Sequence, residues 1–80
     1  MMDESIRNIL AEHGNLPLDV AKIRDEDDLY QAGLTSHASV NVMLALEDEF
    51  GVEFPETMLC KSTFESVAAI RVALSALTGP

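Results

Sequence analysis

The sequence predicts an all-α domain, a bundle of three longer helices and one short helix with a long first loop. Three observations support this fold class. The chain has 80 residues, which gives room for one domain over residues 1–80 with a single modest core. Apolar residues recur at helical spacing in three separate stretches. The β-like segment 52–54 is too short to form a paired strand.

The first helix is predicted over residues 3–13. Its apolar positions lie three or four residues apart and therefore share one helical face. They are Ile6, Ile9, Leu10 and His13. Gly14 follows directly and favours the left-handed conformation that often ends a helix.

Residues 15–35 show no comparable period, and we predict an ordered loop that packs on the bundle. Pro17 limits helix formation near the start of the loop. Apolar residues spread along the segment would anchor it: Leu16, Leu18, Val20, Ile23, Leu29, Tyr30 and Leu34. Within the loop, a helical turn is predicted over residues 27–32 and is closed by Gly33.

The clearest helix is predicted over residues 36–50, and Gly51 ends it. Thr35 or Ser36 is the predicted N-cap, because a hydroxyl at this place can accept a hydrogen bond from an unpaired N–H of the first turn. The predicted core stripe consists of Val40, Met43, Leu44, Leu46 or Glu47, and Phe50.

Two further helices are predicted in the last third of the chain. Pro55 suits the first position of a short helix over residues 55–59. Residues 62–65 have the S-x-x-E form of a capping box, which is predicted to open the last helix. The core stripe of that helix would be Phe64, Val67, Ile70, Leu74 and Leu77. Residues 78–80 end it.

The charge balance excludes several classes of partner. Five basic and 14 acidic residues give a net charge of −9, so we expect no nucleic-acid and no membrane partner, but attraction to basic protein surfaces. The first ten residues contain no long apolar stretch, and no signal peptide or membrane span is expected. A single cysteine fits a reducing compartment. We expect a cytoplasmic monomer that is not an enzyme.

Ser36 is the residue at which chemistry is predicted. It stands where the loop turns, after Gly33, into an acidic amphipathic helix. The first turn of a helix has unpaired N–H groups and the positive end of the helix dipole, so it tolerates a bound phosphate. From spacing alone the interpretation of Ser36 as only a helix cap is favoured, and Ser39 is the nearest rival hydroxyl.

This part of the chain resembles the acyl and peptidyl carrier proteins. Their pattern is D-x-L-x-x-x-G-L, then D-S-L, then L-E-x-x-F-G-x-x-x-P. The matching residues are Asp27, Leu29, Gly33, Leu34, Ser36, Leu46, Glu47, Phe50, Gly51, Val52 and Pro55. The resemblance covers nearly the whole chain. It implies an acyl-carrier-like four-helix bundle with a 4'-phosphopantetheine arm on Ser36, installed from coenzyme A by a phosphopantetheinyl transferase. The thiol of the arm would hold an acyl cargo as a thioester.

The chain departs from this pattern at the start of the helix. Thr35 replaces Asp and His37 replaces Leu, while Ala38 and Asn41 stand where fatty-acid carriers are usually acidic. The basic surfaces of fatty-acid enzymes would therefore be attracted less strongly to the start of this helix. The G-L-[ST]-S-x-A-S-V core is more similar to stand-alone aminoacyl carrier proteins.

That similarity implies a small amino acid as cargo. A seryl-tRNA-synthetase-like amino acid:[carrier protein] ligase would load it with ATP, and a downstream enzyme would accept it. The alternatives are a carrier for fatty-acid or polyketide-type synthesis and, in another class, an unmodified acidic helical interaction module. Residues predicted to contact partners are Thr35, His37, Ala38, Ser39, Asn41 and Glu47.

Other candidate sites are weaker. Cys60 has no base near it in the sequence and is predicted to be a small buried core residue. His13, His37 and Cys60 are too scattered for a metal site. The acidic run at 25–28 does not match a calcium loop, because Tyr30 and Ser36 stand where that loop requires glycine and glutamate.

Overall fold

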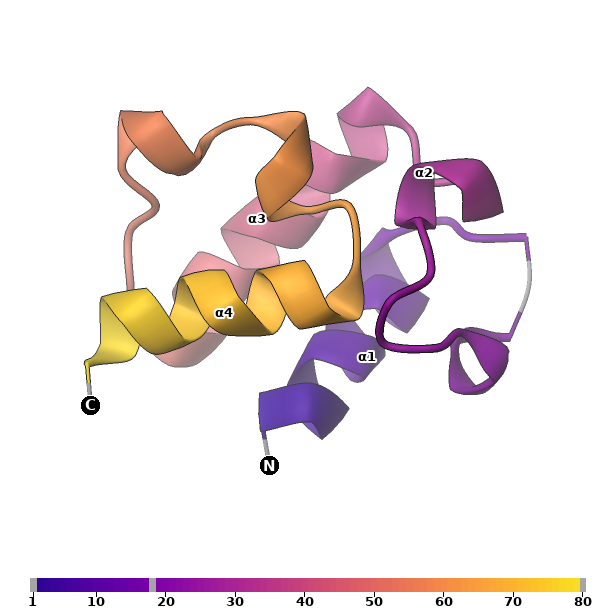
Figure 1. Ribbon diagram of the computed structural model, residues 1–80, viewed down its shortest axis with the longest axis horizontal. Helices are drawn as coiled ribbons and strands as arrows, with labels where there is room; N and C mark the ends of the chain where they lie inside the picture. Colours follow the sequence, from indigo (N-terminus) through magenta and orange to yellow (C-terminus); the bar gives the residue numbers. More distant parts are fainter. Residues whose placement is uncertain (1, 18, 80) are drawn as a thin grey trace.

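The computed structural model describes residues 2–17 and 19–79, and the described chain is all-helical (Figure 1). Its α-helices are α1 (Met2–His13), α2 (Leu29–Ala32), α3 (Ser36–Phe50) and α4 (Val67–Thr78). Single 3-10 turns occur at Val20–Lys22, Glu56–Met58 and Lys61–Thr63. The predicted all-α class, with three longer helices and one short one, is confirmed. The short helix is α2, however, while the segment predicted as helix 55–59 forms only one 3-10 turn after Pro55.

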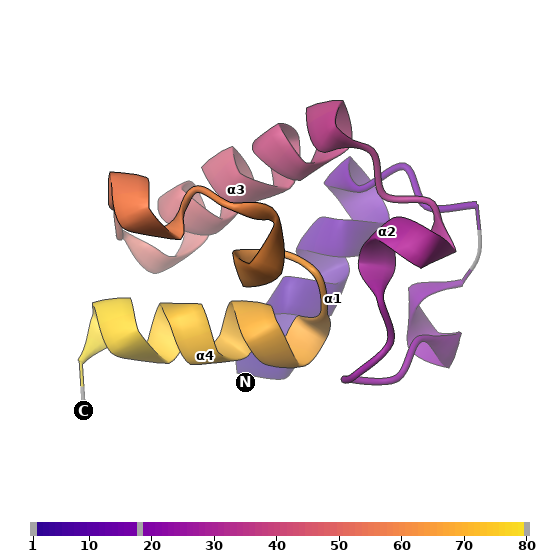
Figure 2. The ribbon, with the colours of Figure 1, turned by 45° about the horizontal axis from the view of Figure 1, so that its top comes forward.

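Helix α1 packs against both α3 and α4. The segment between α3 and α4, drawn in orange, covers the side of these two helices that faces away from α1 (Figure 2). One core joins all of these elements, and its fully buried large side chains are Ile6, Leu10, Leu29, Val42, Leu46, Val67, Ile70 and Leu74. No helix among the described residues is long and apolar enough to cross a bilayer.

In α1 the predicted core face is confirmed for its three aliphatic residues but not for His13. Ile6, Ile9 and Leu10 are buried, whereas His13 is exposed in the last turn, with its Nε2 3.7 Å from a carboxylate oxygen of Glu12. A half-polar ring at the end of a helix gains little from burial, because its nitrogens would lose water without finding a partner.

In α3 the predicted core stripe is partly wrong. The side chains that enter the core are Ala38, Val42 and Leu46, spaced four residues apart. Val40 and Leu44 were expected inside, but they are 50% and 53% exposed. Helix α3 is apolar on more than one face, so periodicity alone could not determine which face packs inward.

The first loop packs on the bundle, as predicted, through Val20, Ile23, Leu29 and Leu34. Asp28 caps α2 by accepting hydrogen bonds from the backbone of Tyr30 and Gln31, and Gly33 ends the helix with φ at +122°. A Cβ at this glycine would lie 2.6 Å from Cδ of Pro17, so only glycine fits here. Leu18 lies outside the described residues.

Helix α4 begins later than predicted, and the capping-box interpretation of residues 62–65 is wrong. The N-cap is Ser66, whose Oγ accepts a hydrogen bond from Ala69 N at 3.0 Å. Two bonds from the first loop explain the shift: Leu29 N donates to Glu65 O at 2.7 Å, and Ala68 N donates to Asp25 O at 2.9 Å. The Glu65 carbonyl accepts the first of these hydrogen bonds, from the loop, and α4 begins only after this residue.

An ion-pair network ties the first loop to α1 and α4. Arg7 of α1 donates to the carbonyls of Val20 and Ile23, at 2.9 and 2.7 Å, and to Asp25 at 2.7 Å. Arg71 of α4 donates to Asp25 at 3.1 Å and to Asp3 at 2.9 Å. Hydrogen bonds from Arg7, and next from Arg71, lower the pKa of Asp25 below its ordinary value. Asp25 is therefore the anion that joins three segments.

We expect Asp25→Asn to lower the urea midpoint of unfolding at pH 7. We also expect the midpoint of the variant to depend less on pH in the acidic range than that of the wild type. In the wild type Asp25 is ionised at pH 7 and stabilises the fold. As the pH falls below about 3.9, the ordinary aspartate pKa, the unfolded chain protonates first, and this stabilisation is lost down to the lower pKa of the folded state. Urea melts between pH 7 and pH 2.5 measure both effects. Glu26→Gln, an exposed neighbour, is the matched control, and equal curves for the two variants would contradict the network's role.

Candidate functional site

The N-cap of α3 is Thr35, which decides between the two predicted cap residues. Thr35 is extended, at φ −92° and ψ 162°, and its Oγ1 accepts a hydrogen bond from Ala38 N at 3.0 Å. Ser36 is then the first residue of the helix. The interpretation of Ser36 as only a helix cap is therefore wrong, because the neighbouring threonine holds that position.

Ser36 presents a free hydroxyl on the surface. The residue is exposed, and among residues 2–17 and 19–79 its Oγ has no recorded hydrogen-bond partner. Ser39, the rival hydroxyl, is half-buried and donates to the carbonyl of Ser36 at 2.7 Å. Of these two serines, Ser36 is the one that another enzyme can modify without breaking an existing bond. It also lies at the positive end of a helix of 15 residues, where a phosphate is tolerated.

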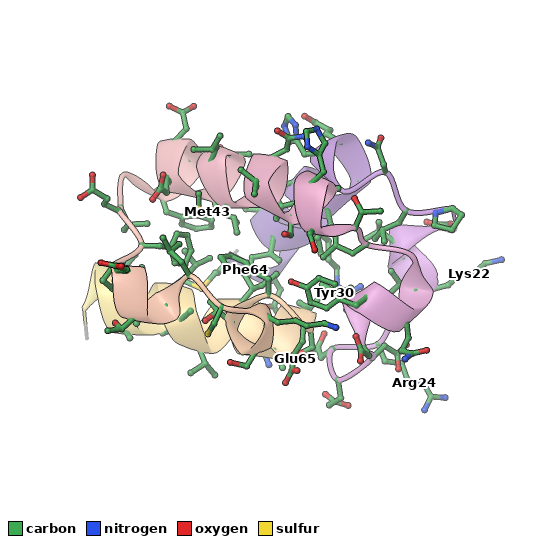
Figure 3. The ribbon with its side chains drawn as sticks, turned by 90° about the horizontal axis from the view of Figure 1, so that it is seen from above. Lys22, Arg24, Tyr30, Met43, Phe64 and Glu65 are labelled. Carbon is green, nitrogen blue, oxygen red and sulfur yellow. The ribbon has the colours of Figure 1, made fainter. Side chains whose placement is uncertain are left out.

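An open groove of about 580 Å³ begins at this serine. It lies between the first two turns of α3 and the segment 59–64, with α2 at one end (Figure 3). The lining residues are Tyr30, Leu34, Thr35, Ser36, Ser39, Val40, Met43, Leu59, Cys60, Lys61 and Phe64. Met43 was predicted to be core, but it is only half-buried and forms part of this lining.

The groove combines an apolar floor with polar groups. Leu34 and Phe64 are buried beneath it, and Phe64 packs on the ring of Phe54 at 5.3 Å between centroids. Lys61 Nζ lies 4.8 Å from the centroid of the Tyr30 ring, a cation–π contact. Burial raises the pKa of the Tyr30 hydroxyl.

Cys60 is exposed, so its prediction as a core residue is wrong. It immediately precedes the 3-10 turn Lys61–Thr63, and its neighbour Leu59 is likewise 49% exposed. Cys60 Sγ lies 3.2 Å from the hydroxyl of Ser62 and 3.4 Å from that of Thr63. These two hydrogen bonds lower the pKa of the thiol, with that of Ser62 contributing most.

The six residues predicted to contact partners fall into four groups. Thr35 and Ser39 line the groove beside Ser36, while His37 and Asn41 are exposed elsewhere on α3. The prediction for Ala38 is wrong, because its side chain is only 1% exposed and belongs to the core.

Glu47 already has a partner within the chain. Its carboxylate accepts a hydrogen bond from Phe54 N at 2.9 Å and thereby holds the segment that follows α3. Sequence reasoning missed Tyr30 and Lys61 as parts of the site, since both come from other elements and carried no local signal. Among the described residues no group of three His, Cys, Asp or Glu side chains could hold a metal ion.

Comparison of the chain with known proteins shows the family to which it belongs. The family model described as a phosphopantetheine attachment site matches residues 4–72. The chain belongs to this family. Its members carry 4'-phosphopantetheine as a covalent group, and the free Ser36 hydroxyl, its place at the N-terminal end of α3 and the adjoining groove fit such a group.

Individual relatives are more specific. The chain is 51% identical to an aminoacyl carrier protein of Agrobacterium fabrum over 69 residues. The matched segment covers 86% of this chain and 83% of the relative. It is similar, at 45% identity and a TM-score of 0.94, to an Agrobacterium tumefaciens carrier protein crystallised with an engineered Bradyrhizobium japonicum glycine:[carrier protein] ligase and ATP; the match covers 96% of this chain and 100% of that one.

A third similarity concerns a loaded carrier. A structure of the Bradyrhizobium japonicum ligase complexed with glycylated carrier protein matches with a TM-score of 0.77 and 26% identity. The match covers 90% of this chain and 96% of the other. The fold described above therefore recurs in solved carrier proteins.

Proposed function

We propose that this protein carries a small amino acid as a thioester on a phosphopantetheine arm attached to Ser36. The observation that carries the proposal is the free hydroxyl of Ser36 at the first position of α3, in a chain 51% identical to an aminoacyl carrier protein. When bound, the arm supplies a terminal thiol, the group that holds the cargo. Thr35 fixes the turn that presents the Ser36 oxygen, and that oxygen is the nucleophile toward coenzyme A in a phosphopantetheinyl transferase.

The surface around Ser36 supports a partner other than a fatty-acid enzyme. The exposed residues of the next two turns, His37, Val40, Asn41 and Leu44, include no carboxylate. A partner that docks there gains from shape and apolar contact more than from basic residues. We propose a seryl-tRNA-synthetase-like amino acid:[carrier protein] ligase as the loading enzyme, with ATP, and a downstream enzyme as acceptor, all in the cytoplasm. The chain itself has no catalytic role in this scheme.

Charging of the holo protein tests the proposed cargo. With ATP and a glycine:[carrier protein] ligase, we expect radiolabelled glycine or alanine to become bound to the holo protein and to be released by mild thioester cleavage. The apo protein should remain unlabelled under the same conditions. Mass spectrometry of the released species identifies the cargo. Exclusive charging with malonyl or fatty acyl groups, by their own transferases, would contradict the proposal.

A further inference from the structure

A separate groove lies between α1 and α3, which we call the α1–α3 groove. It has a volume of about 590 Å³ and shares no lining residue with the groove at Ser36. Its apolar lining consists of Ile9 from α1 and of Leu44 and Ala45 from α3. Leu44 is 53% exposed, so no other part of the described chain covers it. The α1–α3 groove therefore offers apolar surface to a partner.

The charged groups of the α1–α3 groove are acidic. Glu12 comes from α1, and Asp48 and Glu49 come from α3. No lysine or arginine lines the groove, and His13, whose Nε2 lies 3.7 Å from the Glu12 carboxylate, is the one lining residue that can become a cation. Within residues 2–17 and 19–79, neither Asp48 nor Glu49 forms an ion pair. Negative charge without a partner therefore lies beside the exposed leucine.

The positions of these three carboxylates are unfavourable for the helices that carry them. Glu12 lies in the last turn of α1, and Asp48 and Glu49 lie in the last turn of α3. The last turn is the negative end of the helix dipole, where an anion destabilises the helix and a cation stabilises it. The last turn of α3 contains no basic residue that would compensate. Charges that cost stability and have no partner in the fold are typical of a binding surface.

Resting on the loading by a ligase proposed above, we propose that a basic helix of that ligase docks in the α1–α3 groove, so that α1 forms part of the contact. An amphipathic helix with lysine or arginine matches both properties of the groove. Its apolar side can cover Leu44 while its cations face the three carboxylates. A second copy of this chain does not match, because its net charge of −9 would repel the same carboxylates.

The distance from Ser36 is compatible with simultaneous loading. Asp48 follows Ser36 by 12 residues in the same helix, about 18 Å along its axis at 1.5 Å per residue. A helix that occupies the α1–α3 groove therefore leaves Ser36 and an arm attached to it free to enter the active site of the ligase.

Charging kinetics test the docking site. Holo protein, verified by intact mass, is charged by a glycine:[carrier protein] ligase at low salt, and the rate is measured against carrier concentration. We expect Glu12→Gln to raise KM about fivefold at unchanged kcat, the equivalent of one exposed ion pair of about 1 kcal/mol. Asp48→Asn combined with Glu49→Gln should raise KM about twentyfold, because two such pairs are lost. Added salt should raise the KM of the wild type towards those of the variants.

Two controls distinguish docking from a structural effect. Glu4→Gln should leave KM unchanged, since Glu4 is exposed on α1 but lies outside the α1–α3 groove. Glu12→Asp keeps the charge and should have a KM close to that of the wild type. Because the groove carboxylates oppose the helix dipoles, their neutral variants should have urea midpoints equal to or above that of the wild type. A higher KM in these variants then cannot result from unfolding.

The possible results separate the docking site from the proposed function. A wild-type holo protein that the ligase does not charge contradicts the proposed function itself. If the wild type is charged but Glu12→Gln has the same KM as Glu4→Gln, the docking of α1 is overturned and the proposed function stands. A dimer in sedimentation analysis that is lost in Leu44→Ser, with unchanged KM values, would assign the groove to a second copy and would also overturn the proposal.

Discussion

Ser36→Ala is expected to abolish attachment of the phosphopantetheine arm, and with it all charging by an amino acid. The substitution removes the one oxygen that the proposal makes the nucleophile. It leaves the cap of α3 in place, because Thr35 Oγ1 is the acceptor for Ala38 N. The free energy of unfolding should therefore change by no more than about 0.5 kcal/mol, as for other surface substitutions. Intact mass after coexpression with a phosphopantetheinyl transferase measures the attachment, and a urea melt measures the stability.

Two neighbouring hydroxyls supply the controls. Ser39→Ala loses the bond to the Ser36 carbonyl but should still gain one arm. Thr35→Ala should gain the arm as well, while losing about 1 kcal/mol of stability together with the cap. If Ser36→Ala gained the same mass as the wild type, the attachment would lie elsewhere, and Ser39→Ala would then be the first variant expected to lose it.

The parts of this fold that the sequence predicted are those that depend on local signals. The ends of α3 could be predicted from the hydroxyl residue Thr35 before the helix and from Gly51 after it. In the structure Gly51 adopts the left-handed conformation, with φ at +62°. The turn predicted over residues 27–32 followed from Gly33, which acts on residues within four positions and does close α2. The helix start placed a hydroxyl at residue 35 or 36, but the choice of Ser36 as the attachment site came from the resemblance of residues 27–55 to the carrier proteins.

The features that the sequence could not give depend on contacts between distant residues. The start of α4 is set by bonds from Leu29 and Asp25 of the first loop, so a good capping box at 62–65 is overridden. The groove likewise arises where Tyr30 and Lys61 meet, 31 positions apart in the sequence. For α3, two apolar faces competed for the core, and only packing against α1 decided between them.

Ala38→Asp is expected to lower the stability of the fold strongly. Fatty-acid carriers are usually acidic at this position, so the change looks conservative from the sequence. In this structure Ala38 is 1% exposed and lies in the core row of α3 with Val42 and Leu46. An ionised carboxylate placed there without a partner costs several kcal/mol, and the larger side chain also strains the packing. The total stability of 80 residues is only about 4–12 kcal/mol, so we expect most of it to be lost.

Asn41→Asp is the matched control for this substitution. It introduces the same charge three residues later on the same helix, but on an exposed side chain, and should change the free energy of unfolding by no more than about 0.5 kcal/mol. Circular dichroism and urea melts of the two variants at pH 7 measure the difference. Equal stability would show that α3 does not bury Ala38. A large difference would mean that the uncharged start of α3 is partly a requirement of packing, so that acidic docking charge can be added at Asn41 but not at Ala38.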